Sequence, residues 1–208
     1  MTKKEIVLFG YSGHSFVVND CLNGAFIMGY YDLKEKANNP LQLSYLGEGN
    51  SSDFSSLGKD TCVFPSVGDN QLRKKLRTTF IDNSLNETRV IHPNSTVSES
   101  STIGLSTLIG PQAIVNAFAK IGNGVIINSG AIIEHECVVS DFVHIAPGAV
   151  LAGCVSVGEG SLIGANTVVK EGISIGVNVI IGAGSVILND IPDNEMWAGN
   201  PAIKKKSL

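Results

Sequence analysis

A strict six-residue period of aliphatic side chains runs through residues 91–192. Every sixth residue from Ile91 to Ile187 is Ile, Val or Leu, which makes seventeen positions without a break in phase. The residue two places before each of them is usually small, as at Ala113 and Ala131. Because side chains alternate along a strand, the aliphatic and the small residue point to the same side. The pattern predicts a parallel β-helix with three six-residue repeats in each triangular coil.

Gly and Asn mark the corners of this predicted β-helix. One of these two residues stands three places after the aliphatic residue in nine of the seventeen repeats. Both tolerate a positive φ, which a sharp corner often needs. A sandwich of short strands would give loops of irregular length, so the constant spacing argues against that alternative.

Residues eighteen apart stack on one outer face of such a coil, so each face carries its own column of side chains. The first outer column contains Thr96, Ile114, Ile132, Val150, Val168 and Val186. The second outer column contains Leu108, Ile126, His144, Leu162 and Ile180. The third outer column contains Thr102, Lys120, Val138, Ser156, Ser174 and Pro192. The first two are apolar and should not stay in water, so we expect a homotrimer in which both pack against neighbouring chains.

The chain before the repeats has a different pattern. Residues 5–9 indicate a buried strand, residues 10–14 a glycine turn, and the following residues a helix. Backbone N–H groups at the start of such a helix can hold a phosphate. A second strand, residues 26–31, ends at Asp32, whose carboxylate either accepts a hydrogen bond from a ribose or base or is simply solvated.

The remainder of this part predicts one more strand and one more helix. Residues 33–60 are polar and indicate mostly loop, and residues 61–67 form a third apolar run, although Pro65 argues against a central strand. A basic helix follows Gly68. The predicted organisation is therefore an α/β, Rossmann-like βαβ unit over residues 1–85. An all-β parallel β-helix follows over residues 86–208 and ends in an extended segment.

Composition and charge narrow the classes of partner. Apolar residues make up 43% of the chain and charged residues 16%, with a net charge of −4, so nothing favours nucleic acid or an anionic membrane. We expect no signal peptide, because the N-terminus lacks the apolar segment of one. We expect no membrane insertion, because no apolar run is long enough to span a bilayer. The four cysteines are far apart and lack C-x-x-C spacing, which is typical of a reduced, cytoplasmic protein.

Two histidines in the repeats are candidates for chemistry. His135 lies at a predicted corner and is followed by Glu136, which could orient the imidazole of a general base. His144 interrupts the second outer column, where it is either functional or a buried histidine bonded to a backbone carbonyl. The two lie nine residues apart, half of one coil, so they face opposite sides of one chain. They can share a site only between subunits.

Six segments together resemble the hexapeptide-repeat acyltransferases, and more narrowly the bacterial nucleotide-sugar acetyltransferases. They are residues 10–14, Asp32, residues 68–70, residues 133–137, residues 142–144 and residues 199–202. That family includes the UDP-4-amino-sugar N-acetyltransferase of the bacillosamine pathway and the sialic acid O-acetyltransferases. The resemblance implies a left-handed β-helix and acetyl-CoA as co-substrate.

The resemblance also implies roles for particular residues. His135 would be the base and Glu136 its partner, while His144 would lie at the acetyl thioester. The remaining residues of the acetyl-CoA groove would be Gly153, Ala165 and Ala183. The nucleotide-sugar would be held by Ser12, Gly13, His14, Asp32, Gly68 and Asn70. Leu33 and Asp69 depart from residues common in the family, an acidic residue and Asn, which leaves the nucleotide open.

The leading hypothesis is thus an acetyl-CoA-dependent N-acetyltransferase for a nucleotide-linked amino sugar of the UDP-4-amino-sugar type, without a metal. Two alternatives stay open. The same base chemistry would serve a sugar O-acetyltransferase of the sialic acid type. A trimeric β-helix can also be a non-catalytic scaffold, against which His135 and Glu136 argue.

Overall fold

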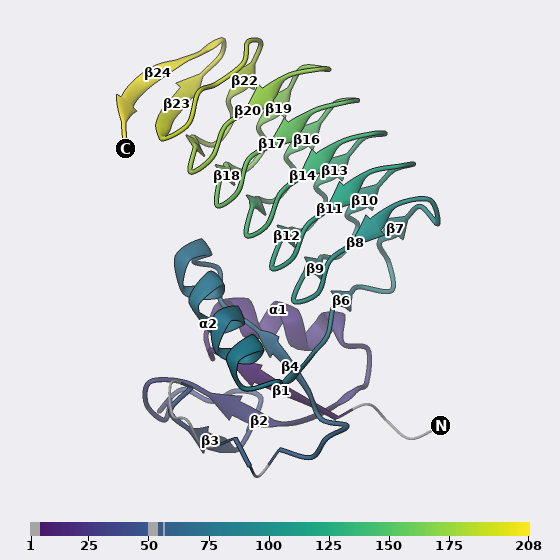
Figure 1. The fold of residues 1–208 in the computed structure, drawn as a ribbon, viewed down its shortest axis with the longest axis vertical. Helices are drawn as coiled ribbons and strands as arrows, with labels where there is room; N and C mark the ends of the chain where they lie inside the picture. Colours follow the sequence, from purple (N-terminus) through teal and green to yellow (C-terminus); the bar gives the residue numbers. More distant parts are fainter. Residues whose placement is uncertain (1–4, 50–53, 56) are drawn as a thin grey trace.

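The computed structural model describes residues 5–49, 54–55 and 57–208, which form an N-terminal α/β unit and a long β-helix stacked above it (Figure 1). The unit contains one parallel sheet with the strand order β3-β2-β1-β4-β5. Its strands are β1 (Glu5–Phe9), β2 (Phe26–Tyr31), β3 (Tyr45–Gly47), β4 (Cys62–Pro65) and β5 (Asn86–Glu87). Its helices are α1 (Gly13–Cys21) and α2 (Asn70–Asp82). The predicted Rossmann-like unit is confirmed.

Two details of this sheet differ from the sequence-based expectation. The segment expected to be mostly loop contributes β3, which pairs with β2 at the sheet edge. Pro65 ends a strand that has neighbours on both sides, and it lies opposite Phe9. A proline is tolerated there because the last residue of a strand can do without its ladder hydrogen bond.

The β-helix is built from two-residue strands in three parallel sheets. The first sheet contains β7 (Thr96–Val97), β10 (Ile114–Val115), β13 (Ile132–Ile133), β16 (Val150–Leu151), β19 (Val168–Val169) and β22 (Val186–Ile187). The second contains β6 (Val90–Ile91), β9 (Leu108–Ile109), β12 (Ile126–Ile127), β15 (His144–Ile145), β18 (Leu162–Ile163) and β21 (Ile180–Ile181). The third contains β8 (Thr102–Ile103), β11 (Lys120–Ile121), β14 (Val138–Val139), β17 (Ser156–Val157) and β20 (Ser174–Ile175). Strands pair with a spacing of eighteen residues throughout, as the six-residue period predicts.

Aliphatic residues of the period fill the interior of these coils. From Ile109 to Ile187 they are buried, and the small residues two places earlier are buried with them. The first coil is the exception, because no coil lies beneath it: Ile91 is 38% exposed, and Val97 is only partly buried. The inward position of Cys137 is also confirmed. Burial raises the pKa of its thiol to about 11, so it is not a thiolate nucleophile.

The N-terminal unit covers part of the second outer column, which corrects one expectation. Leu108 and Ile126 are fully buried in a cluster with residues of α1 and the sheet, such as Val18 and Leu8. This column is therefore not free along its length to pack against a neighbour. A charge at Ile126 would disrupt the junction of the two parts of one chain rather than an interface between chains.

The C-terminal segment closes the last coil. β23 (Glu195–Gly199) pairs with β21, and β24 (Ala202–Ser207) returns antiparallel to β23. Trp197 packs against the core of the β-helix. Within the described ranges, no helix has the length and apolar character needed to cross a membrane.

A buried arginine joins the two parts. Arg73 of α2 is 1% exposed, and its Nε donates to the carbonyl of Gly124 in the β-helix at 2.5 Å. Its Nη2 donates to the carbonyl of Phe142 at 3.0 Å and to Oδ1 of Asn70 at 2.7 Å, while Nη1 donates to the carbonyl of Gly68 at 3.0 Å. The guanidinium therefore fixes the start of α2 against two neighbouring coils.

Candidate active site

His135 and Glu136 form an exposed pair at the corner that follows β13. Glu136 has a φ of +61°, and its N–H donates to the carbonyl of Ala117 in the coil below. The carbonyl of His135 accepts from the N–H of Cys154 in the coil above. These backbone bonds hold the corner in place, so the two side chains project from a rigid element.

The pair has the geometry of an oriented base. Nδ1 of His135 lies 3.2 Å from Oε2 of Glu136, and a carboxylate at that distance favours the tautomer with the proton on Nδ1. Nε2 then keeps a free lone pair that can accept a proton. Both side chains are more than half exposed, at 57% and 61%, so a substrate can reach them.

Gly153 provides the space for the imidazole. A Cβ atom added at Gly153 would lie 2.5 Å from Cε1 and 2.7 Å from Nε2 of His135. The ring therefore rests on the backbone of the coil above, a position that only glycine leaves open.

We predict that Gly153→Ala impairs the acetyl transfer that the family resemblance implies, while leaving the fold intact. The exposed ring of His135 can rotate away from the added methyl group, so the melting temperature should hardly change. A catalytic group displaced by about 1 Å can lose about 10²-fold in rate. Steady-state kinetics together with thermal unfolding check this. Full activity in the Gly153→Ala variant would show that the position of the ring over residue 153 is unimportant.

His144 lies on the far side of the same coils and is held by its own chain. Nδ2 of Asn128 lies 3.2 Å from Nε2 of His144, and the ring also hydrogen-bonds the backbone of Gly68. Burial, with Arg73 and His14 nearby, lowers the pKa of His144 to about 4. His144 is therefore half-buried and held within its own chain, and its assignment to the acetyl thioester stays a prediction.

His14 at the start of α1 is also half-buried and lies near Arg73 and His144. Burial and the charge of Arg73 lower its pKa to about 4. Its Nε2 is buried and has no hydrogen-bond partner among the described residues. A buried polar atom without a partner is costly, so this nitrogen is a candidate contact for a bound ligand.

These two histidines predict a pH dependence of stability. Their folded pKa of about 4 lies below the ordinary 6.5, so between these values the unfolded chain binds more protons than the native one. Stability is therefore complete above about pH 6.5 and falls towards pH 4, by up to about 3 kcal/mol for each histidine. Urea unfolding between pH 4 and 7 measures it. A His14→Asn/His144→Asn variant should show a flatter profile, and an equal slope in both proteins would contradict the assignment.

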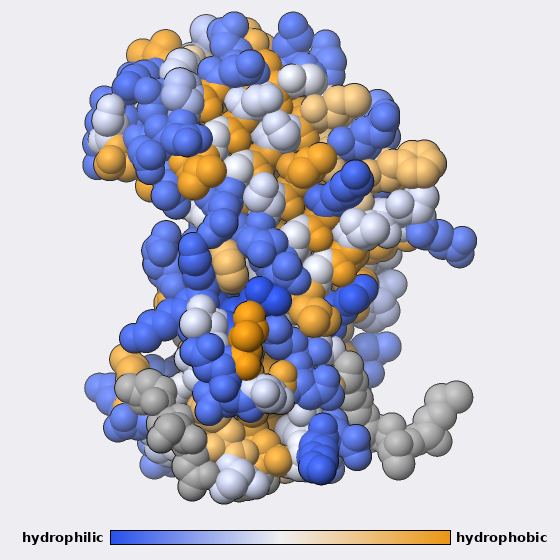
Figure 2. Space-filling model, viewed as in Figure 1, coloured by the Kyte–Doolittle hydropathy of each residue, from blue (hydrophilic) through white to orange (hydrophobic). Residues whose placement is uncertain are grey.

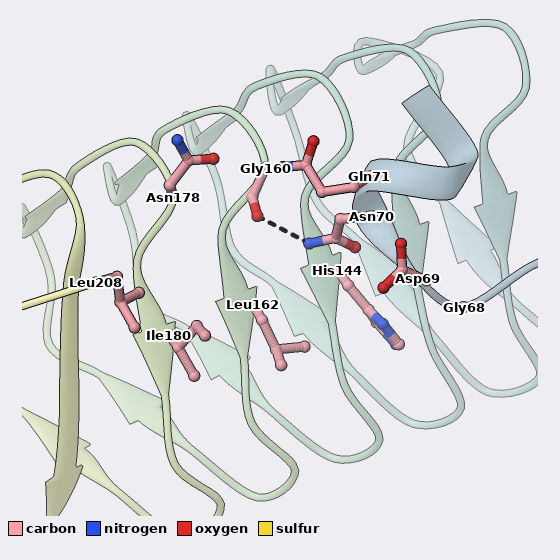
Figure 3. Close-up of a pocket in the computed structure, with 10 residues that line it drawn as sticks. All are labelled: Gly68, Asp69, Asn70, Gln71, His144, Gly160, Leu162, Asn178, Ile180 and Leu208. Atoms are coloured by element: carbon pink, nitrogen blue, oxygen red, sulfur yellow. Dashed lines mark hydrogen bonds between the residues drawn. The ribbon is translucent and has the colours of Figure 1, made fainter. Parts of the chain in front are cut away.

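A cavity of about 400 Å³ lies between the start of α2 and the second outer column. Figure 3 shows His144, Leu162 and Ile180 along the strands, with Asn70 reaching across to the carbonyl of Gly160 at 2.8 Å. The space-filling view shows the surface narrowing between the two parts of the chain (Figure 2). Three residues assigned from the resemblance, Gly68, Asn70 and His144, therefore line one cleft.

A smaller cavity of about 150 Å³ lies at the ends of the N-terminal strands. It is bordered by Gly10, Asp32 and Leu33 together with side chains of α2. The carboxylate of Asp32 accepts from the N–H of Tyr11 at 2.9 Å and forms an ion pair with Lys36 at 3.0 Å. Asp32 thus fixes the glycine turn that leads to the exposed Ser12 and Gly13.

One chain does not bring all the assigned residues together. The corner with His135 and Gly153 separates the first and third sheets, whereas Ala165 and Ala183 lie on the corner between the second and first sheets. The two corners therefore border opposite edges of the first outer column, and the cleft with His144 lies on another side.

Sequence reasoning assigned no role to Arg73, because it stands in a run of basic residues. One signal was available: Arg73, Leu76 and Phe80 have the spacing of one helix face, and Phe80 is buried. Arg73 occupies an apolar position of that face, while Leu72 is 45% exposed.

Family models match both parts of the chain. The model of the PglD N-terminal domain matches residues 5–80, and that of the bacterial transferase hexapeptide (six repeats) matches residues 136–171. The acetyltransferase domain of PglB from Neisseria gonorrhoeae FA1090, solved with acetyl coenzyme A, is 31% identical over 98% of this chain and 100% of that one, with a TM-score of 0.91. No curated protein matches the chain.

A second solved structure is equally similar. It is a histidine-to-alanine variant of GDP-perosamine N-acetyl transferase from Caulobacter crescentus, in complex with CoA and GDP-perosamine. It is 31% identical over 98% of this chain and 97% of that one, with a TM-score of 0.90. WeeI from Acinetobacter baumannii AYE, at 24% identity over 96% of this chain and 99% of that one, shares the fold with a TM-score of 0.85.

The parallel β-helix of six-residue repeats, the match to the bacterial transferase hexapeptide model and the solved relatives together define an acyltransferase of the hexapeptide-repeat class. Within that class, the chain belongs to the nucleotide-sugar N-acetyltransferase family with a PglD-type N-terminal domain and a left-handed β-helix. The predicted family, fold and enzyme class are confirmed.

Proposed function

We propose that this protein transfers the acetyl group of acetyl-CoA to the amino group of a nucleotide-linked sugar, with His135 as the general base. The observation that carries the proposal is the pair of His135 and Glu136 on an open corner, with Nδ1 engaged and Nε2 free. The solved relatives with acetyl coenzyme A, and with CoA and GDP-perosamine, support the choice of donor and acceptor class.

The reaction is a direct transfer in this proposal. The sugar amine attacks the thioester carbonyl while Nε2 of His135 takes a proton from the nitrogen. Glu136 stabilises the imidazolium that forms. We assign the developing oxyanion to a backbone N–H near Gly153. The intermediate then expels the CoA thiolate, which takes the proton from the His135 imidazolium and leaves as the thiol. The thiol of Cys137 is no competing nucleophile, because it is buried and donates to the carbonyl of Ala152 at 3.1 Å.

The N-terminal unit, which extends through β5, binds the nucleotide of the acceptor in this proposal. The start of α1 presents backbone N–H groups at Gly13 and His14, which suit a diphosphate. The buried Nε2 of His14 lacks a partner among the described residues, so a phosphate or sugar oxygen would satisfy it. The cavity beside Asp32 is the place for the nucleoside, with uridine as the leading choice. The β-helix, which begins with β6, then holds acetyl-CoA.

The site is shared between subunits of a trimer in this proposal. The first outer column is apolar, and Val168 in this column is 44% exposed in the single chain. The corner with His135 lies along one edge of this column and the corner with Ala165 along the other. If two chains pack through this column, the corner with His135 in one chain lies next to the corner with Ala165 in its neighbour. Acetyl-CoA would lie in the resulting groove.

Val168→Asp should therefore convert the trimer to smaller species, because it places a charge in an apolar interface. Val138→Asp is the matched control: Val138 is also 44% exposed on a two-residue strand, but belongs to the polar third outer column. Light scattering at micromolar concentration should show a trimer for the wild type and the control only. If Val138→Asp dissociates the trimer and Val168→Asp does not, the interface lies on the third outer column, which would contradict the proposal.

The test of the function is release of CoA thiol from acetyl-CoA with a panel of UDP-, GDP- and dTDP-linked amino sugars. We expect release with a UDP-linked 4-amino sugar and little with the corresponding sugar that carries a hydroxyl group. No release with any amino sugar, from protein that binds acetyl-CoA, would overturn the proposal.

A further inference from the structure

A third chemically reactive side chain lies beside the pair of His135 and Glu136. Cys154 follows Gly153 at the corner of the next coil, eighteen residues after Glu136, and its Sγ lies 3.8 Å from Oε2 of Glu136. Of the four cysteines, Cys21, Cys62 and Cys137 are buried, whereas Cys154 is exposed. Its thiol is therefore available to solvent at the same corner as the base.

The backbone fixes this arrangement. Glu136 and Cys154 both adopt the left-handed conformation, with φ of +61° and +60°, and occupy the same position in successive coils. The hydrogen bond from the N–H of Cys154 to the carbonyl of His135, at 3.0 Å, locks the two corners together. The three side chains thus start from points that the β-helix holds at fixed spacing.

The donor atoms have the spacing of a metal site. One ligand atom each of His135, Glu136 and Cys154 lies within 4.8 Å of the others. The N–O separation is 3.2 Å and the O–S separation 3.8 Å. Tetrahedral Zn²⁺, with bonds of about 2.0–2.3 Å, separates its ligand atoms by about 3.3–3.6 Å. Small rotations of these exposed side chains would close the remaining differences.

We propose that His135, Glu136 and Cys154 form a binding site for a thiophilic divalent cation such as Zn²⁺, and that the bound ion inhibits the enzyme. The set of one imidazole nitrogen, one carboxylate oxygen and one thiolate leaves a fourth position for water. The thiol of Cys154 loses its proton to solvent as the metal–sulfur bond forms.

Inhibition follows from the nitrogen that the ion occupies. Nδ1 of His135 is the atom that faces Glu136. When Nδ1 coordinates the ion, the ring proton moves to Nε2, which can then no longer accept a proton from the acceptor amine. The ion also binds the carboxylate of Glu136, which then no longer hydrogen-bonds to the imidazole. This half of the inference rests on the proposed function, whereas binding of the ion does not.

Binding is tested with Co²⁺ and the full-length protein in the absence of CoA. Co²⁺ accepts the same ligands, and a cobalt–thiolate bond gives an intense charge-transfer band in the near ultraviolet. We expect this band at one ion per chain, its loss in Cys154→Ala, and its retention in the control variant His92→Ala. A wild-type spectrum without the band, or a band that survives Cys154→Ala, would overturn the site.

Inhibition is tested by acetyl transfer at buffered free Zn²⁺, with the acetylated sugar measured directly because CoA itself binds zinc. Cys154→Ala should keep its activity without metal and need at least about 100-fold more Zn²⁺ for half-inhibition, since even an outer-shell change weakens sites 10–100-fold. A chelator should restore wild-type activity. Equal inhibition of both proteins would overturn the switch. If no amino sugar is acetylated at all, the proposed function fails, and the cobalt spectra still decide the site.

Discussion

His135→Ala should lower the turnover of acetyl transfer by about 10²–10⁴-fold, the range that general-base catalysis contributes. The affinity for acetyl-CoA should change little, because the imidazole accepts a proton from the acceptor and is not needed to hold the donor. The side chain is exposed, so its removal should leave the coil intact. Steady-state kinetics with both substrates varied, and calorimetry with acetyl-CoA, separate these quantities.

Glu136→Gln is the companion variant. The amide keeps the shape of the side chain but removes the charge that stabilises the imidazolium, so turnover should fall by less than in His135→Ala. The two effects should not add, because Glu136 acts through His135. If His135→Ala weakens acetyl-CoA binding and leaves turnover unchanged, the histidine holds the donor instead.

Arg73→Ala should destabilise the protein by about 3–5 kcal/mol, among the larger effects that a single substitution produces. The guanidinium is the donor to carbonyl groups of Gly68, Gly124 and Phe142, and its removal leaves these buried acceptors without that partner. Burial lowers the pKa of Arg73 to about 10, so it is still charged at neutral pH. Thermal unfolding and urea denaturation, read by circular dichroism, measure the loss.

Lys74→Ala is the matched control. The neighbouring Lys74 also links α2 to the β-helix, through an ion pair with Glu159 at 2.6 Å, but both side chains are largely exposed. Exposed pairs contribute about 0–1 kcal/mol, so this variant should stay close to the wild type. Equal effects of the two substitutions would show that the buried donors of Arg73 do not hold the junction.

The repeats could be predicted in detail because one rule governs them. A period of six fixes the inward residues, the corners and the spacing of eighteen between stacked strands, and the structure follows it from Ile109 onwards. The same rule predicts that Cys154 lies close to Glu136, because the two are eighteen residues apart at equivalent corners. The sequence analysis considered only the outer columns of the strands and therefore did not identify this pair at the corners.

The junction of the two parts could not be predicted, because it follows no period. Nothing local in the sequence indicates that the N-terminal unit buries Ile126, or that His144 interacts with the backbone of Gly68, 76 positions earlier. These contacts depend on how the N-terminal unit docks against one face of the β-helix. The expectation that both apolar columns are free was wrong for this reason.

The most direct test of the central claim is to identify the product. The protein is incubated with ¹³C-acetyl-CoA and a UDP-linked 4-amino sugar, and the product is examined by NMR and mass spectrometry before and after mild alkali. We predict one acetyl group on the amine, as an amide that survives alkali, and product formation about 10²–10⁴-fold slower with the His135→Ala variant. An alkali-labile ester, or equal product from the wild type and His135→Ala, would contradict an N-acetyltransferase that uses His135 as its base.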